Sequence, residues 1–149
     1  MGRRQLACAE VYKRIKDSRK LIGLKSFKKL TTVRAKIEEA PICFMSYGSD
    51  NIIKRSSRTS AISRPGEGST RSLEIFLELV CPSNIDIEEI CAKIRKVILA
   101  DPHPIQNTDG KKDKTTFLLE DRTEGPTGYG IPEVTAMILV ITVIYIDES

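Results

Sequence analysis

The sequence predicts a small, soluble α/β domain in which a strand is followed by a helix that covers it. Two clear periodicities stand one after the other in Thr70–Pro102. Apolar residues alternate with mixed residues over Ser72–Cys81, as in a half-buried strand. From Ile87 to Ile98 they recur at the spacing of an amphipathic helix. A chain of 149 residues supports one core, so we expect a single domain over residues 1–149.

The segments before this unit predict a helix and a strand. Residues 5–22 place apolar side chains on one side of a helix, and Gly23 suits its C-terminal end. Ile42–Tyr47 comes directly after a proline and predicts a strand. The intervening Phe27–Lys36 is ambiguous, because some of its apolar residues alternate but it has few strong strand formers.

The segments after the strand predict the two ends of the helix and two further strands. Asp86 is suited to cap the helix, with Glu89 three residues on, and Asp101-Pro102 ends it. Thr115–Arg122 predicts a short strand. Glu133–Ile146 predicts the last strand and is apolar on both faces, so we place it centrally in the sheet.

Two glycine-containing connections separate the strands. Thr123–Pro132 is best interpreted as a hairpin-type connection, because it leads into a strand and not a helix. Gly48–Ser69 is long, rich in serine and basic, and lacks periodicity. Three interpretations compete for it: a disordered insertion, a β-hairpin arm that orders against a partner, and a phosphate-binding loop. We prefer the arm; the phosphate loop lacks the G-x-x-x-x-G-K-[ST] spacing.

Charge is unevenly distributed along the chain. The net charge is +4, yet residues 1–36 hold twelve Lys and Arg against two acids, and residues 120–149 hold six acids against one arginine. Such asymmetry suits a surface that faces a polyanion, or head-to-tail packing of copies. The basic N-terminal helix is most simply a solvated face.

Catalytic and metal-binding patterns are lacking in the sequence. The single histidine, His103, lies between two prolines in a loop, where we expect a surface residue. No nucleophile elbow or H-E-x-x-H motif occurs. The four cysteines form no C-x-x-C pair, so we interpret them as buried, reduced thiols and expect neither zinc nor disulfides. We expect no enzyme, no cofactor, no membrane span and no signal peptide, and therefore a protein made in the cytosol.

Several phrases of the sequence resemble one family of phage proteins. They are VYKRIKD and LKSFKKL near the N-terminus, APICFMSYGSD before the basic loop, STRSLEIFLELV and IDIEEICAKIRKVILADP after it, and EGPTGYGIPEVTAMILVITVIYID at the end. In these phrases and in element order the chain resembles the tail terminator, or tail completion (minor tail), proteins of long-tailed bacteriophages. The resemblance covers nearly the whole chain and rests on layout and short apolar phrases.

That resemblance implies an α/β (α+β) sandwich in which a mixed, mostly antiparallel sheet is flanked by two main helices. It implies a virion protein, assembled in the host cytoplasm, that forms a homo-oligomeric ring on the tail tube, usually a hexamer. The ring ends tube polymerisation and meets the head–tail connector or stopper, while genomic DNA passes through its lumen without sequence-specific binding. Neck-ring proteins of related fold are the alternative, and a sequence-independent nucleic-acid-binding module is a further one.

Four basic residues of the long segment are our candidates for a subunit interface or the lumen. They are Lys54, Arg55, Arg58 and Arg64. Complementary charged edges would help to set the register between copies of such a ring, with the edge of one sheet meeting its neighbour.

Overall fold

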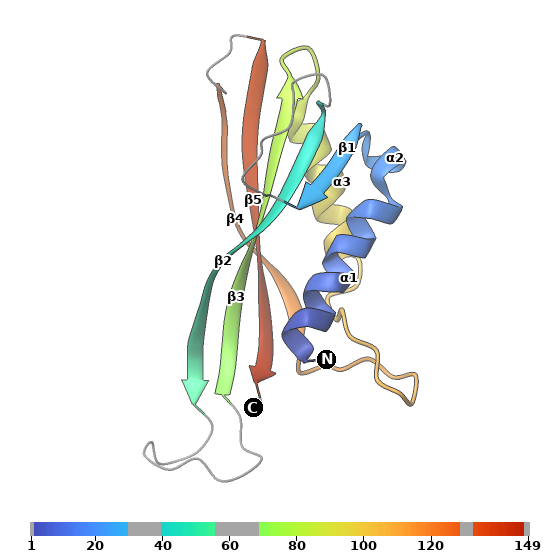
Figure 1. Cartoon of the computed structure of the whole chain (residues 1–149), viewed down its shortest axis with the longest axis vertical. Coiled ribbons are helices and arrows are strands. Elements are labelled where there is room, and N and C mark those ends of the chain that lie inside the picture. Colours follow the sequence, from blue (N-terminus) through green and yellow to red (C-terminus); the bar gives the residue numbers. More distant parts are fainter. Residues whose placement is uncertain (1, 30–39, 56–68, 129–132, 148–149) are drawn as a thin grey trace.

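The fold is a five-stranded sheet with its helices on one face (Figure 1). A computed structural model describes residues 2–29, 40–55, 69–128 and 133–147. In chain order the elements are α1 (Arg3–Asp17), α2 (Arg19–Ile22), β1 (Ser26–Lys29), β2 (Ile42–Arg55), β3 (Ser69–Pro82), α3 (Ile87–Leu99), β4 (Phe117–Gly128) and β5 (Val134–Asp147).

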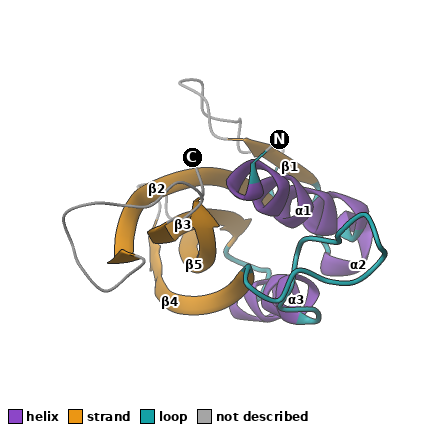
Figure 2. Cartoon of the chain, turned by 90° about the horizontal axis from the view of Figure 1, so that it is seen from below, coloured by secondary structure: helices purple, strands orange, loops and turns teal. Residues whose placement is uncertain are grey.

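The sheet order is β1-β2-β3-β5-β4, with β1 parallel to β2 and every other pair antiparallel. Figure 2 shows α1, α2 and α3 together on one side of the curled sheet. The predicted mixed, mostly antiparallel sheet with two main helices is therefore confirmed. β5 lies between β3 and β4, as its two apolar faces predicted.

The core lies between the helices and one face of the sheet. Every second residue of β3 and β5 points into the core, so their alternating apolar residues form its sheet side. On this face the fully buried side chains of the two strands are Leu73, Ile75, Leu77, Leu79, Cys81, Leu139, Ile141 and Val143. A smaller apolar cluster, consisting of Ala40, Ile42, Phe44, Val80 and Val134, is separate from this main core.

The first helix is shorter than the sequence predicted. The expected helix over residues 5–22 is two helices, because α1 ends at Asp17 and α2 begins at Arg19. Gly23 ends α2 in the left-handed conformation, with φ 96°, as predicted. One side of α1 packs on the sheet through Ala7, Cys8, Val11 and Ile15.

The second main helix, α3, begins and ends as predicted. The Asp86 carboxylate accepts hydrogen bonds from the backbone N–H groups of Glu88 and Glu89. At the other end, Arg14 Nη1 donates to the carbonyls of Ile98 and Asp101, each at 2.6 Å. Ile98 belongs to the last turn of α3, whose carbonyls lack partners within the helix, and Asp101 follows the C-cap residue Ala100. The arginine therefore caps the end of α3 and ties it to α1.

Two strands extend beyond their predicted bounds, and a third forms at the start of the stretch that was ambiguous. β2 continues to Arg55, eight residues beyond the predicted end of this strand at Tyr47. β4 continues to Gly128 through two register shifts, so most of the predicted connection at 123–132 is strand. At the start of the ambiguous stretch, Ser26–Lys29 forms the short strand β1. It has few strong strand formers, and pairing with β2 stabilises the strand.

The four cysteines are buried and unpaired, as predicted. Cys43 and Cys81 stand on β2 and β3 with no exposed surface, and Cys91 faces them from α3. Burial raises the pKa of the Cys81 thiol from 9.0 to about 11. Thiols in this environment act as small apolar side chains, because the reactive thiolate is disfavoured.

Asp86→Ala should lower the free energy of unfolding by about 0.5–2 kcal/mol, because two N–H groups of α3 lose their acceptor. Asp86→Asn is the matched control and should retain most of the stability, since asparagine caps equally well. Urea denaturation of the three proteins measures the difference. An asparagine variant as unstable as the alanine variant would contradict a role in capping.

Stability should fall as the pH rises from about 9 to about 11. In this window the unfolded chain releases the Cys81 proton, which the folded chain retains, so the unfolded state gains up to about 2 kcal/mol. Denaturation at several pH values should show a shallower decline for Cys81→Ala than for the wild type. Parallel declines would contradict the assignment.

Candidate functional site: the hairpin arm and the two edges of the sheet

β2 and β3 form a hairpin arm that extends past the helical layer. We define it as residues 48–55 together with 69–75. Figure 1 shows these strand ends reaching below the foot of α1. Their last two backbone pairs join Lys54 to Thr70 and Arg55 to Ser69. Residues 56–68 of the predicted arm lie outside the described residues, and its docking on a partner stays a prediction.

The structure places two of the four predicted interface residues. Lys54 and Arg55 are the last residues of β2, at the end of the arm. Arg58 and Arg64 lie outside the described residues. The neighbouring Ile52 and Ile53 are 43% and 55% exposed, so the arm carries apolar as well as basic groups. Both isoleucines are therefore accessible for contact with another molecule.

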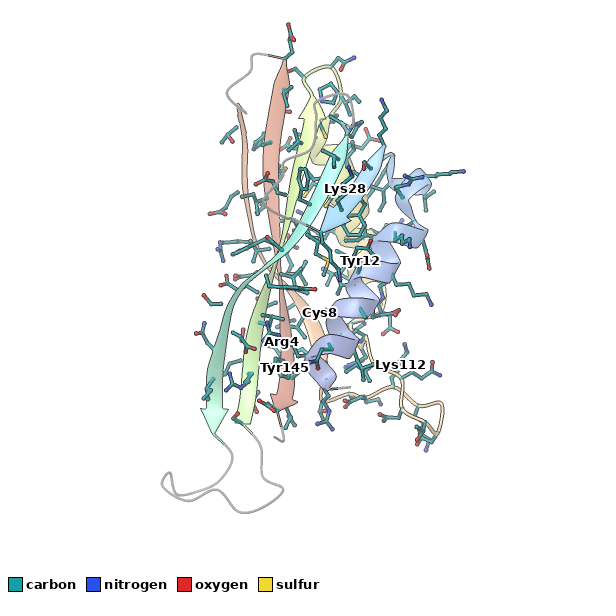
Figure 3. The ribbon with its side chains drawn as sticks, in the orientation of Figure 1. Arg4, Cys8, Tyr12, Lys28, Lys112 and Tyr145 are labelled. Carbon is teal, nitrogen blue, oxygen red and sulfur yellow. The ribbon has the colours of Figure 1, made fainter. Side chains whose placement is uncertain are left out.

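An ionic network centred on Asp50 holds the base of the arm. The Tyr145 hydroxyl donates to Asp50 Oδ2 at 2.6 Å, and Arg4 Nη1 lies 3.1 Å from the same oxygen. Arg71 Nη1 lies 3.6 Å from Asp50 Oδ1, and its Nε lies 3.3 Å from Asp147 Oδ2. Figure 3 shows Arg4 and Tyr145 side by side below Cys8. The network thus joins α1, both strands of the arm and β5.

The centre of this network is shielded from water, while Arg4 at its margin is 46% exposed. Only 17% of the Asp50 side chain and 28% of the Arg71 side chain are exposed. Burial, together with the hydrogen bond to Asp50, raises the pKa of Tyr145. The tyrosine therefore stays protonated at neutral pH and remains a donor to the carboxylate.

A second ion pair holds the start of α1. Arg3 Nε lies 3.0 Å from Asp113 Oδ2, and Arg3 Nη1 donates to the carbonyl of Ile146. Burial disfavours ionisation of Asp113, but hydrogen bonds from Thr115 and Arg3 keep its pKa below the usual value. The first turn of α1 is thereby fixed between β5 and the segment that precedes β4.

A cleft of about 1130 Å³ opens beside these two groups of charges. Its wall combines Arg3, Arg4 and Arg71 with Asp50, Asp109, Asp113 and Asp147. Because both signs of charge are present and mostly bind each other, the cleft does not select an anion or a cation. Within the described ranges, no group of three or more His, Cys, Asp or Glu is arranged to hold a metal ion.

The two edges of the sheet carry opposite charge. On the β1 edge, Lys28 and Lys29 of the strand and Lys25 just before it are exposed. On the opposite edge, every residue of β4 from Leu119 to Gly128 is exposed, and Glu120, Asp121 and Glu124 outnumber Arg122. In the part of the chain that the structure describes, neither strand has a partner on its outer side. Open edges of this kind offer backbone groups for pairing.

Sequence reasoning found the uneven charge but missed the Asp50 network. Asp50 fell in the segment interpreted as an arm, with no contact assigned to it, and Tyr145 was assigned only to an apolar strand. The sequence holds little that could have revealed the network. Arg71 lies outside the alternating and helical patterns, and Asp50 and Tyr145 are 95 residues apart in the chain.

The helices of the described residues include none that is long and apolar enough to cross a membrane.

His103, predicted to be a surface residue, is half-buried in its loop, with Nδ1 3.1 Å from the carbonyl oxygen of Thr116. This contact fixes the ring against the start of β4.

Comparison with known proteins finds similarity in fold. No family model matches the chain. No curated protein matches it either. Among solved structures, a chain from the virion of a native gene transfer agent particle is similar, with a TM-score of 0.50 and 11% sequence identity. The match covers 92% of each chain, so the likeness extends over nearly the entire fold.

Tyr145→Phe should lower the free energy of unfolding by about 1.5–3 kcal/mol, because Asp50 loses its shortest hydrogen bond in a shielded site. Tyr47→Phe is the matched control. Tyr47 is 43% exposed and its hydroxyl interacts with the Cys8 thiol, a weak hydrogen-bonding group, so the loss should be smaller. Equal losses in urea denaturation would contradict the importance of the network.

Proposed function

We propose that this chain is a structural virion protein that forms a ring capping a phage-type tail tube. The observation that carries the proposal is the likeness of fold, over 92% of both chains, to a chain of a gene transfer agent virion. The resemblance of the sequence to tail terminators supports the finer assignment. In this role the ring ends tube polymerisation and joins the tail to the head connector or stopper, and genomic DNA passes through its lumen.

The arm supplies the means of self-assembly in this proposal. It extends past the helical layer, carries exposed Ile52 and Ile53, and ends in Lys54 and Arg55. Apolar groups give affinity when they are buried against a neighbour, and basic groups set its orientation. The Asp50 network keeps the base of the arm rigid, which lowers the entropy lost on docking. Arg58 and Arg64 extend the same basic character in the sequence.

The proposal assigns the protein an assembly role without catalysis or cofactor, in a ring of six copies. Its partners are further copies of itself, the tail tube protein and the connector. Another ring of the neck between head and tail is the neighbouring possibility, with the same self-assembly and a different position in the virion.

A basic surface favours nucleic-acid binding as a second candidate function. It consists of exposed residues of α1, α2 and β1 and the loop between them: Lys13, Lys16, Arg19, Lys20, Lys25, Lys28 and Lys29. Such a surface binds phosphates without reading sequence, and its affinity falls steeply with salt. A monomer whose DNA affinity falls by several decades between low and moderate salt would support this function and contradict the ring.

Arg55→Glu combined with Arg58→Glu should impair both ring formation and capping, because the arm then presents the wrong charge to its neighbour. Purified protein is added to polymerising tail tubes, and tube length is measured by electron microscopy. Wild type should give short tubes with a terminal ring, and the variant longer, uncapped tubes.

Lys111→Glu with Lys114→Glu is the matched control, since it makes the same change of net charge on exposed residues away from the arm. It should cap tubes like the wild type. Normal capping by the arm variant would remove the arm from the mechanism, and tubes unaffected by the wild type would contradict the proposed function.

A further inference from the structure

The two open edges of the sheet are matched in level as well as in charge. Strand register can be traced across the sheet from one edge to the other. Lys28 is paired with Phe44, Phe44 with Glu78, Glu78 with Ile138, and Ile138 with Glu124. Lys28 and Glu124 therefore stand at opposite ends of a single row. Directly paired residues point to the same face, so both side chains lie on the same side of the sheet.

Neighbouring positions obey the same rule. Lys29 is paired with Met45, and through Leu77 and Leu139 the row ends at Thr123. The register shifts of β4 fall between Glu120 and Arg122 and between Glu124 and Thr127. Between these shifts, Thr123 and Glu124 stand in regular strand at the level of Lys29 and Lys28. The row of Arg122 ends at Ser46, one residue beyond the paired part of β1.

Strand direction also fits a continuing sheet. β1 runs parallel to β2, and three antiparallel steps lead from β2 through β3 and β5 to β4. β4 therefore runs opposite to β1. If two copies lie side by side in the same orientation, β4 of one meets β1 of the next as an antiparallel pair. Antiparallel pairs are the commoner kind and can form between short strands.

We infer that β4 of one copy pairs with β1 of the next, with Glu124 of the first copy beside Lys28 of the second. The contact continues the five-stranded sheet from subunit to subunit. It is a head-to-tail contact between two different surfaces, the kind that closes into a ring when the rotation between copies permits. The inference rests on the proposed self-assembly and adds a contact between sheet edges to the contact made by the arm.

A second copy fits this edge better than an unrelated strand. Each copy presents Lys28 on one edge and Glu124 on the other at the same level, so each of these two side chains would meet the opposite charge on a neighbouring copy. Glu124 is 55% exposed in its side chain, and its nearest described cation is Arg122 at 3.9 Å. A lysine from a neighbour would therefore meet a weakly neutralised carboxylate.

Charge reversal at the two ends of the row gives a direct test. Lys28→Glu alone and Glu124→Lys alone should each weaken self-association, by roughly five- to tenfold at each contact, because like charges then face each other. Sedimentation velocity over a range of concentrations measures the assembly. An equimolar mixture of the two variants should assemble like the wild type, since alternating copies restore every opposite pair in a ring of even number.

Lys111→Glu is the matched control for one reversed lysine away from both edges, and it should assemble normally. The doubly reversed chain, with both substitutions, should also assemble. Failure of the mixture and of the doubly reversed chain to recover would overturn the inference, as would normal assembly of both single variants.

A covalent ladder provides a second test that does not depend on charge. Within one chain Lys28 and Glu124 are four strand spacings apart, about 19 Å along the sheet, too far for a disulfide. Lys28→Cys with Glu124→Cys in the same chain should therefore give, on mild oxidation, a ladder of covalent oligomers in non-reducing gels. Mixing the two single variants should give dimers only. Wild type should give none, because its cysteines are buried.

The outcomes separate this inference from the proposed function. Rings that form normally but yield no ladder would overturn the edge contact and leave the ring. Open filaments that yield the ladder would support the edge contact and contradict a capping ring. Wild type that remains monomeric at every concentration, with no ladder from the cysteine variant, would overturn the edge contact.

Discussion

The antiparallel pairing of β3 with β5 is the constraint on which the rest of the structure depends. Their register runs without a shift from Ser69 opposite Asp147 to Pro82 opposite Val134. Because side chains alternate strictly along each strand, this register commits one face to the helices and the other to solvent or a partner. It also brings Arg71 beside Tyr145 and aligns the rows that end at the two open edges.

Polar contacts occupy the end of the sheet where the apolar core stops. Apolar residues fill the space under α3 and most of α1, but at the start of α1 the same face turns to Asp50, Arg71 and Tyr145. Such groups stabilise only when they are paired, since an unpaired charge in a shielded place is costly. The arm is therefore supported at its base by directional contacts while its end keeps exposed apolar side chains.

The sequence predicted those features that depend on local pattern. The alternation over Ser72–Cys81, the helical spacing after Ile87 and the cap at Asp86 each lie within a few residues, and all three are confirmed. Full strand lengths and the Asp50 network were missed, because each depends on a neighbouring strand distant in the chain. Charge asymmetry was visible, but its division between the two edges required the sheet order.

The central claim is that copies of this chain close into a ring, and native mass measurement of the purified protein, alone and on tail tubes, tests it most directly. A closed ring predicts one discrete species whose mass is a fixed multiple, about six, of the 16.7 kDa chain. A ladder of masses without a preferred size would indicate an open contact. A protein that stays monomeric at every concentration and on tubes would contradict the ring.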